Sequence, residues 1–287
     1  MNTPEHPRAF VIGWPISHSR SPLIHNYWLK SLGLPGSYEK TAVPPEALEG
    51  FLGSLNEQGL VGGNVTLPHK EGAFALCAKT SPSAQALQAV NTVWMEAGEL
   101  CGDNTDVVGF LASLDADIPD WDKACEKAVV LGAGGAARAI IAGLIGRGVE
   151  RITIINRSRE RAEELVTLAH RIRPDQAVAV ADYATLPREL AAANLLVNTT
   201  SLGMRGQPPL DIGLEPLPDH AAVADIVYVP LETALITSAK ARGLKTSGGL
   251  GMLLNQAVPG FERWFGKKPV VTPALRALVE ADIRGGS

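Results

Sequence analysis

A glycine-rich turn directly follows a short apolar run near the middle of the chain. Residues 128–131 read AVVL, which is typical of a buried parallel strand, and residues 139–145 have the composition of a helix. Between them, Gly132 permits a tight turn, Gly134 lets main-chain N–H groups approach a pyrophosphate, and Ala137 lets the helix pack closely on its strand. The start of such a helix also offers N–H groups and partial positive charge to phosphates. We therefore predict a dinucleotide-binding site, the alternative being an ordinary strand-turn-helix unit without a ligand.

The residues after the next predicted strand indicate which dinucleotide is bound. Residues 151–155 (RITII) form this strand, and Asn156 stands where an NAD-binding chain usually has Asp or Glu to accept a hydrogen bond from the ribose. Arg157, Arg159 and Arg161 follow. A carboxylate would repel a 2′-phosphate, whereas arginine pairs with it, so the sequence predicts NADP rather than NAD. The alternative is a merely basic helix start, but arginines there oppose the helix dipole, which itself favours an anionic partner.

Another predicted strand ends in a loop that suits the nicotinamide. Residues 194–198 (NLLVN) read as a strand that leads into the loop 199–204 (TTSLGM), and residues 222–228 (AVADIVY) read as a further strand. A helix is predicted from Gly248 to about Phe265, and a last helix over 273–283. These final helices are expected to return to the N-terminal part of the chain.

The N-terminal third has its own cluster of hydroxyl groups. Ser19 and Ser21 precede Pro22, which suits the first turn of a helix that extends to Gly33. Two serines at a helix start could bind a carboxylate, since hydroxyls and N–H groups converge there. They could equally cap the helix, and the local sequence alone favours Ser21 as the N-cap.

Polar residues also lie at the end of a predicted strand in this region. The predicted strands, which alternate with helices, span residues 9–13, 37–43 and 60–66. This alternation favours a second open, mainly parallel sheet, in which ligands bind beyond the carboxyl ends of the strands. Asn64, Thr66 and Lys70 lie at or just after one such end. For Lys70, a solvated lysine at the start of a helix is the alternative.

A strand pair is predicted further on, over residues 87–93 and 99–106 on either side of a short turn. The polar ends of these strands carry Asn91 and Asp106. We interpret Asp106 either as the N-cap of the following helix or as a carboxylate that orients the ammonium of Lys70.

Composition narrows the class of protein. A length of 287 residues suits two domains, and a net charge of −4 provides no basic surface for nucleic acid. Cys77, Cys101 and Cys125 lie far apart, which fits neither a disulfide framework nor a zinc site and indicates a reducing compartment. The N-terminus has no apolar segment of a signal peptide, and an arginine and several glycines interrupt the most apolar window. We expect a cytoplasmic protein with no membrane span, no bound metal and no nucleic-acid partner.

Taken together, the motifs resemble those of the shikimate dehydrogenase family, which acts in the biosynthesis of aromatic amino acids. Nine segments occur in the family's order and cover nearly the whole chain. They are GWPISHSRSPLIHN (13–26), GGNVTLPHK (62–70), AVNTV (89–93), GDNTDVVG (102–109), GAGGAA (132–137), NRSRERA (156–162), NTTSLGM (198–204), DIVYVP (225–230) and GLGMLLNQA (249–257). Each segment is weak alone, whereas the ordered set is highly specific.

The resemblance implies reversible, NADPH-dependent reduction of 3-dehydroshikimate to shikimate, with Lys70 and Asp106 as the catalytic pair. It assigns the substrate to Ser19 and Ser21, which match carboxylate-binding positions, and to Asn64, Thr66, Asn91, Tyr228 and Gln256 around the ring. It assigns the cofactor to Gly132, Ala133, Gly134, Gly135, Ala136, Asn156, Arg157, Ser158, Arg161, Thr199, Ser201, Met204, Ile226, Gly249 and Met252. The family commonly has Thr where this chain has Ser158, and either hydroxyl can hold phosphate.

The implied fold is α/β, with two open domains separated by a cleft. A substrate domain with a mainly parallel sheet is expected over 1–107, with the C-terminal helices of 248–287 packed on it, and a Rossmann-type NADP domain over 108–247. The expected partners are small molecules, and a homodimer is left open. Two other functions stay in view: a quinate/shikimate dehydrogenase with relaxed cofactor use, and an NADP-binding regulatory module without catalysis.

Overall fold

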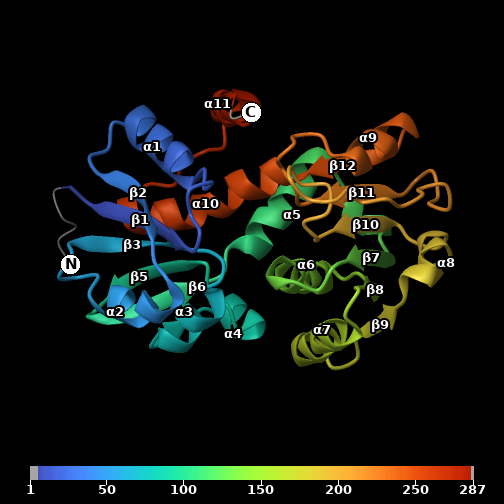
Figure 1. The fold of residues 1–287 in the computed structure, drawn as a ribbon, viewed down its shortest axis with the longest axis horizontal. Helices are drawn as coiled ribbons and strands as arrows, with labels where there is room; N and C mark the ends of the chain where they lie inside the picture. Colours follow the sequence, from blue (N-terminus) through green and yellow to red (C-terminus); the bar gives the residue numbers. More distant parts are fainter. Residues whose placement is uncertain (1–5, 286–287) are drawn as a thin grey trace. The chain divides into compact units, whose positions relative to one another are not determined.

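The computed structural model describes residues 6–285, which form two compact units (Figure 1). The first unit comprises residues 6–105 and 256–282, and the second comprises 106–255 with 283–285. Each unit is built on its own six-stranded sheet. The expected α/β class is confirmed, while the roles of the two units as substrate and cofactor domains stay predictions.

The sheet of the first unit has the strand order β2-β1-β3-β5-β6-β4. Its strands are β1 (Arg8–Gly13), β2 (Ser37–Ala42), β3 (Leu60–Val65), β4 (Lys79–Thr80), β5 (Thr92–Glu96) and β6 (Glu99–Asp103). β1 pairs in parallel with β2 and β3, and β4 pairs in parallel with β6, whereas β5 runs antiparallel to β3 and β6. The sheet is therefore mainly parallel, and the polar residues that follow β1 and β3 lie at the same edge.

The helices of the first unit cover this sheet and include the C-terminal part of the chain. They are α1 (Ser21–Leu32), the short helix η1 (Pro45–Ala47), α2 (Leu48–Gly53), α3 (Lys70–Leu76), α4 (Pro82–Leu87), the second half of α10 (Gly249–Phe265) and α11 (Pro273–Gly285). The indole N–H of Trp264 donates to the carbonyl of Val93 at 2.9 Å, and that of Trp28 donates to the carbonyl of Val270 at 3.1 Å. These two bonds fix the C-terminal segment on strand β5 and helix α1 of the first unit.

The second unit contains a fully parallel sheet in the order β12-β11-β10-β7-β8-β9. Its strands are β7 (Lys127–Leu131), β8 (Arg151–Ile155), β9 (Ala177–Ala181), β10 (Leu195–Asn198), β11 (Ala222–Asp225) and β12 (Lys245–Gly248). Numbered from β7, this is the 3-2-1-4-5-6 strand order of the dinucleotide-binding fold. β8 and β9 lie on one side of β7, and β10, β11 and β12 lie on its other side. The glycine turn therefore lies at the switch point where such sheets bind ligands.

The helices of the second unit pack on this buried sheet. They are α5 (Asp106–Asp117), η2 (Trp121–Ala124), α6 (Gly135–Gly146), α7 (Arg159–Ile172), η3 (Tyr183–Thr185), α8 (Leu186–Leu190), α9 (Ala234–Ala241) and the first half of α10. Val129, Leu131 and Leu196 are fully buried in its core. Both neighbours of each central strand are parallel. Because strands in parallel sheets are buried on both faces, they consist of continuous apolar residues, which is the pattern that predicts this sheet.

The strand predicted over residues 87–93 is wrong. α4 ends at Leu87, Gln88 has a left-handed backbone (φ 52°), and β5 starts only at Thr92. The hydroxyl of Ser81 accepts a hydrogen bond from the main chain of the third residue on and caps α4. The segment thus contains a helix end and a strand start. The start of this helix, Ser81-Pro82, has the same Ser-Pro pair as Ser21-Pro22, from which the first helix is predicted.

Candidate active site

The first unit gathers several of the predicted substrate residues around Asn64, at the end of β3. Asn64 is 5% exposed, and its Oδ1 accepts a 2.6 Å hydrogen bond from the hydroxyl of Tyr38. Its Nδ2 donates to the main-chain carbonyl of Asn91 at 3.1 Å and to Oγ1 of Thr92 at 3.2 Å. The predicted residues Asn64 and Asn91 are therefore neighbours, and Asn64 also bonds Tyr38 and Thr92, for which the sequence predicts no role.

The Asn91 side chain is held in turn by the segment after β6. Its Oδ1 accepts from the main-chain N–H of Thr105 at 2.9 Å and from the hydroxyl of Thr92 at 2.9 Å. The Thr105 hydroxyl donates to the main-chain carbonyl of Gln256 at 2.8 Å. This chain of bonds brings three predicted substrate residues, Asn64, Asn91 and Gln256, into one buried network.

The two serines of the first unit lie at the start of α1, but neither is arranged as predicted for a cap. Arg20 is the residue before the helix and Ser21 is its first residue, so Ser21 is not the N-cap. The hydroxyl of Ser19 instead accepts from the main-chain N–H of Ser21 at 3.3 Å. Nε of Arg20 lies 2.9 Å from a carboxylate oxygen of Asp282 in α11, so an ion pair holds the loop between the two serines.

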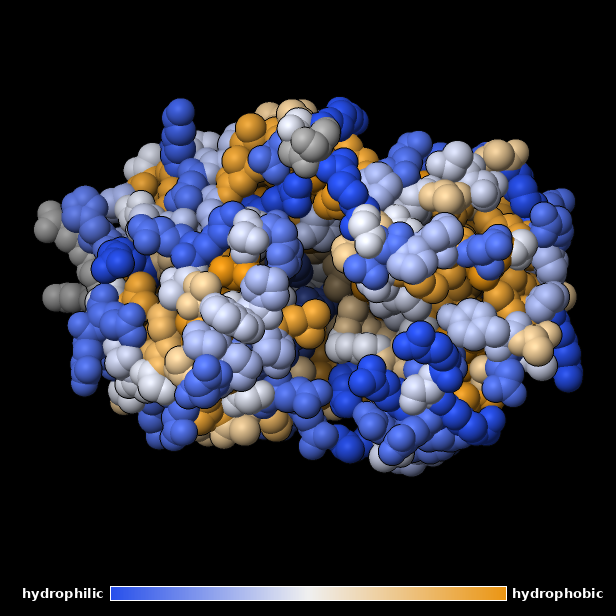
Figure 2. Space-filling view, in the orientation of Figure 1, coloured by the Kyte–Doolittle hydropathy of each residue, from blue (hydrophilic) through white to orange (hydrophobic). Residues whose placement is uncertain are grey.

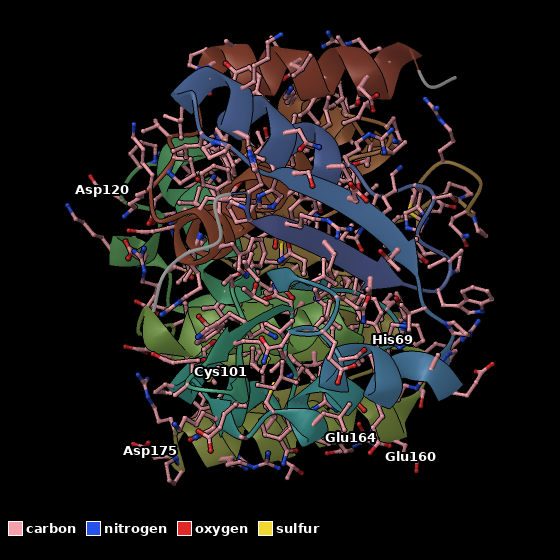
Figure 3. All side chains as sticks on the ribbon, turned by 90° about the vertical axis from the view of Figure 1, so that its left-hand side faces the viewer. His69, Cys101, Asp120, Glu160, Glu164 and Asp175 are labelled. Atoms are coloured by element: carbon pink, nitrogen blue, oxygen red, sulfur yellow. The ribbon has the colours of Figure 1, made fainter. Side chains whose placement is uncertain are left out.

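Thr66 and Lys70 follow β3 in a turn that ends at α3. The main-chain N–H of Thr66 donates to the carbonyl of Ile12 at 2.9 Å, and the carbonyl of Lys70 accepts from Val90 at the same distance. Lys70 is the first residue of α3 and half-buried. The neighbouring His69 is buried, with Nε2 2.7 Å from the carbonyl of Val43 (Figure 3). These contacts fix the backbone from which the lysine side chain extends.

Asp106 and Tyr228 belong to the second unit. Asp106 is the first residue of α5 rather than the residue before it, and it is 7% exposed. Tyr228 follows β11 and is half-buried. The pairing of Asp106 with Lys70 stays a prediction, as does the place of Tyr228 beside the substrate ring.

The glycine turn between β7 and α6 has the geometry of a phosphate site. Gly132 has φ +102°, and a Cβ at this position would lie 2.7 Å from Oγ1 of Thr199. Gly134 precedes α6 and provides no side-chain cap, and a Cβ on Gly134 or Gly135 would meet nothing within 4 Å. The start of α6 thus has no side-chain cap on its N–H groups and no side chain crowding its two glycines, which fits the pyrophosphate of a dinucleotide. Ala137 is fully buried, as close helix packing requires, and Ala133 and Ala136 are half-buried.

The predicted 2′-phosphate residues surround the start of α7. Nδ2 of Asn156 donates to the carbonyl of Ser158 at 2.8 Å, and the Ser158 hydroxyl caps the helix by accepting from the N–H of Arg161 at 3.4 Å. Arg159 is paired with Glu163 at 3.2 Å. In the part of the chain that the structure describes, Arg157 and Arg161 are exposed and form no ion pair. Figure 2 shows a hydrophilic surface over α7.

Asn198 at the end of β10 anchors the loop that is predicted to hold the nicotinamide. Its Nδ2 donates to Oδ1 of Asp225 at 2.9 Å, and its Oδ1 accepts from the hydroxyl and the N–H of Thr200 at 2.7 and 3.0 Å. The hydroxyl of Thr199 donates to the carbonyl of Leu131 at 2.7 Å. The predicted residues of this loop differ in exposure, with Thr199 buried and Ser201 and Met204 exposed.

Asp225 is buried and receives three hydrogen bonds. Besides Asn198, the hydroxyl of Thr233 donates to it at 2.6 Å and the N–H of Val227 at 3.0 Å. Burial raises the pKa of this carboxyl, and the donors oppose that effect only in part. Asn198 lies in the motif NTTSLGM, and Asp225 lies in the motif DIVYVP. No local sequence pattern, however, predicts that these two side chains hold the loop in place.

Three predicted cofactor residues line one small cavity of the second unit. They are Ile226, Gly249 and Met252. A Cβ on Gly249 would lie 2.1 Å from the carbonyl oxygen of Ile226, so only glycine permits this approach of α10 to the end of β11. The structure therefore places residues from two distant motifs at one position.

Residues 6–285 contain neither a candidate membrane span nor a candidate metal centre. Their helices include none that is both long and apolar enough to cross a bilayer. Among the same residues, no three His, Cys, Asp or Glu side chains are grouped so that they could hold a metal ion.

Family models match most of the chain. The shikimate dehydrogenase substrate binding domain matches residues 11–93, shikimate / quinate 5-dehydrogenase matches residues 116–203, and the shikimate 5′-dehydrogenase C-terminal domain matches residues 249–279. A protein of Methylocella silvestris named shikimate dehydrogenase (NADP(+)) is 58% identical over 277 residues, which cover 96% of this chain and 97% of that protein.

Solved structures with the same fold bind both kinds of predicted ligand. Shikimate 5-dehydrogenase from Thermus thermophilus, in complex with NADP(H) and shikimate, is 38% identical with a TM-score of 0.82, covering 98% of this chain and all of that one. Quinate dehydrogenase from Corynebacterium glutamicum, in complex with NAD, is 29% identical with a TM-score of 0.89, covering 96% of this chain and 99% of that one.

Proposed function

Because the chain belongs to the shikimate dehydrogenase family, we propose that it reduces 3-dehydroshikimate to shikimate with NADPH and catalyses the reverse oxidation with NADP. The match extends through both units, and relatives that share more than half of their residues with this chain are named NADP(+)-dependent. The observation that carries the proposal is the uncapped glycine turn at the switch point of the parallel sheet, followed by Asn156 where an NAD-binding chain has a carboxylate.

The residues that would hold the cofactor fit it in charge and in shape. The N–H groups at the start of α6 bind the pyrophosphate, and Arg157 and Arg161 pair with the 2′-phosphate. When bound, NADPH supplies a hydride to the ketone carbon of the substrate. The loop fixed by Asn198 and the residues around Gly249 hold the nicotinamide end in one orientation.

Lys70 and Asp106 act on the substrate oxygen. Negative charge develops there as the ketone is reduced, and the Lys70 ammonium stabilises this charge more in the transition state than in the ground state. Asp106 orients the ammonium, and the proton that the oxygen gains comes from either Lys70 or Asp106. Ser19 and Ser21 bind the carboxylate, while Asn64, Thr66, Asn91, Tyr228 and Gln256 hold the ring and its hydroxyls.

The test is the absorbance of reduced nicotinamide over time, with shikimate or quinate as substrate and NADP or NAD as acceptor. Efficient turnover only with shikimate and NADP is expected. Similar efficiency with quinate or NAD would favour the broader quinate/shikimate group, for which the likeness to a quinate dehydrogenase that binds NAD is the supporting observation. Tight NADP binding without turnover would instead favour a regulatory module.

The place of action and the assembly are further parts of the proposal. Cys77, Cys101 and Cys125 are free thiols, which supports a reducing compartment such as the cytoplasm. A homodimer stays a prediction, and light scattering coupled to gel filtration measures the mass that decides it.

A further inference from the structure

We propose that Thr92 is a positioning residue: its hydroxyl holds two side-chain amides, Asn64 and Asn91, in the orientations that their main-chain partners specify, so that Asn64 accepts and Asn91 donates a hydrogen bond toward the substrate. The inference rests on the proposed function, which assigns both amides to the substrate ring. It adds a residue to which that function gives no role.

The orientation of the Asn64 amide is determined by a main-chain carbonyl. The atom that lies 3.1 Å from the carbonyl oxygen of Asn91 must be Nδ2, because a carbonyl can only accept. The second hydrogen of Nδ2 is donated to Oγ1 of Thr92 at 3.2 Å. Both donors of Asn64 are therefore committed within the protein. Any further hydrogen bond of this side chain must be accepted by Oδ1, which already accepts from Tyr38.

The orientation of the Asn91 amide is determined in the opposite sense. A main-chain N–H can only donate, so the atom 2.9 Å from the N–H of Thr105 must be Oδ1. The Thr92 hydroxyl donates to the same Oδ1 at 2.9 Å. The Thr105 hydroxyl gives its own proton to the closer carbonyl of Gln256. Both lone pairs of Asn91 Oδ1 are thus occupied, and any hydrogen bond that the side chain makes elsewhere must be donated by Nδ2.

One hydroxyl group joins the two amides. β3 and β5 are antiparallel with Asn64 opposite Thr92, so the threonine hydroxyl lies between the amides. It accepts from Asn64 and donates to Asn91, and Thr92 is 2% exposed, so water does not replace it. A side chain without a hydroxyl would leave a buried N–H of Asn64 unpaired and remove one of the donors that orient Asn91.

This arrangement specifies the chemistry of the ligand. Asn64 presents an oxygen and Asn91 presents a nitrogen, so the matching ligand is a polyhydroxylated ring that donates one hydroxyl proton and accepts at another position. Thr92 acts on this match only through the two amides, and its removal should weaken substrate binding while leaving cofactor binding unchanged.

The experiment compares Thr92→Val with Thr92→Ser and with a matched control, Thr153→Val. Thr153 is buried in β8 of the second unit, and its hydroxyl donates to Glu189 at 3.1 Å rather than to a predicted substrate residue. For Thr92→Val we expect the KM and the calorimetric Kd for shikimate to rise about tenfold, as loss of a buried hydrogen bond between amides predicts. The KM for NADP should stay within about twofold of the wild-type value, since that site is untouched.

The Thr92→Ser variant, which keeps the hydroxyl, distinguishes loss of the hydrogen bonds from loss of side-chain packing. Thr92→Ser should restore shikimate affinity, and Thr153→Val should lower thermal stability without changing either KM. If Thr92→Val does not fold, Thr92→Ser and Thr92→Cys replace it, because they have similar shapes and only the hydroxyl is a strong donor and acceptor. The Cys variant should then bind shikimate more weakly than the Ser variant.

The outcomes distinguish the two proposals. A wild-type shikimate affinity in Thr92→Val, or equal affinities in the Ser and Cys variants, would overturn the role of Thr92 and leave the proposed function intact. Equal weakening of shikimate and NADP binding would also overturn it, since this indicates general destabilisation. A wild-type chain that neither oxidises nor binds shikimate would overturn both.

Discussion

The imidazole ring of His25 stacks on the phenol ring of Tyr38, with ring centroids 4.1 Å apart and an angle of 10° between the planes. His25 is fully buried, and among residues 6–285 neither of its ring nitrogens has a hydrogen-bond partner. Burial lowers the pKa of His25 to about 3; the nearby Asn64 amide offsets part of this effect, although it does not meet hydrogen-bond geometry. The ring is therefore an uncharged aromatic support for Tyr38, whose hydroxyl orients Asn64.

Replacement of His25 by Phe should change the pH dependence of stability. The unfolded chain takes up a proton at His25 below pH 6.5, whereas the folded chain does so only near pH 3. The contribution of His25 is thus fully present above pH 6.5 and is lost as the pH falls toward 3, at about 1.4 kcal/mol per pH unit. His25→Phe removes this loss, so it should be as stable as the wild type at pH 7.5 and about 2 kcal/mol more stable at pH 5.

Urea unfolding at the two pH values measures this difference. His69→Phe is the matched control, because His69 is also buried but contacts the carbonyl of Val43, so its loss should cost about 1–3 kcal/mol at pH 7.5, where His25→Phe should cost nothing. A His25→Phe protein that loses stability at pH 7.5 would show that the His25 nitrogens are paired in solution.

Removal of the Lys70 ammonium should affect the chemical step. Lys70→Ala is expected to lower kcat by at least about 100-fold with a smaller change in the KM for shikimate, because the ammonium stabilises charge that develops in the transition state. Steady-state rates of NADP reduction measure both parameters. Lys79→Ala is the control, since Lys79 lies in the same unit and is an exposed lysine paired with Glu99. An unchanged kcat in Lys70→Ala would exclude this residue from the reaction.

Two glycines of the same turn should respond differently to alanine. At Gly134 a Cβ meets no protein atom, so Gly134→Ala should fold normally but raise the KM for NADP about tenfold or more by displacing the pyrophosphate. At Gly132 the positive φ and the close Thr199 hydroxyl make alanine strained, so Gly132→Ala should lose about 2 kcal/mol or more of stability. Thermal unfolding and NADP titration separate the two effects. Wild-type NADP affinity in Gly134→Ala would argue against a phosphate at this turn.

Two arginines in the first turn of α7 should differ in cofactor binding. Arg161→Ala is expected to raise the KM for NADP about tenfold through loss of a charge-assisted bond to the 2′-phosphate, with little change for shikimate. Arg159→Ala should have a smaller effect, because Arg159 is already paired with Glu163. The same kinetics with NAD provide the decisive comparison: an equal loss of NAD affinity in Arg161→Ala would mean that the arginine does not recognise the 2′-phosphate.

The sequence by itself determined the features that depend on neighbouring residues. The strand, turn and helix around Gly132 are local, since the apolar run, the glycine turn and the helix lie within one short segment. The structure confirms the strand, the turn and a helix over the predicted residues 139–145, and it begins that helix earlier, at Gly135. The α/β class was equally predictable, because a fully buried parallel strand requires an apolar run. Prediction failed at 87–93, where a short helix and a strand adjoin and neither is long enough to show its own period.

Only the tertiary structure decided how the polar groups are paired. Asn64 and Thr92 are 28 residues apart, and they meet because β3 and β5 pair in antiparallel register, which no local pattern reveals. The same holds for Asn198 and Asp225, which meet across β10 and β11, and for His25, whose burial depends on aromatic side chains of α10. Hydrogen bonds require partners within about 3 Å, so the roles of donors and acceptors are determined only when distant segments are packed together.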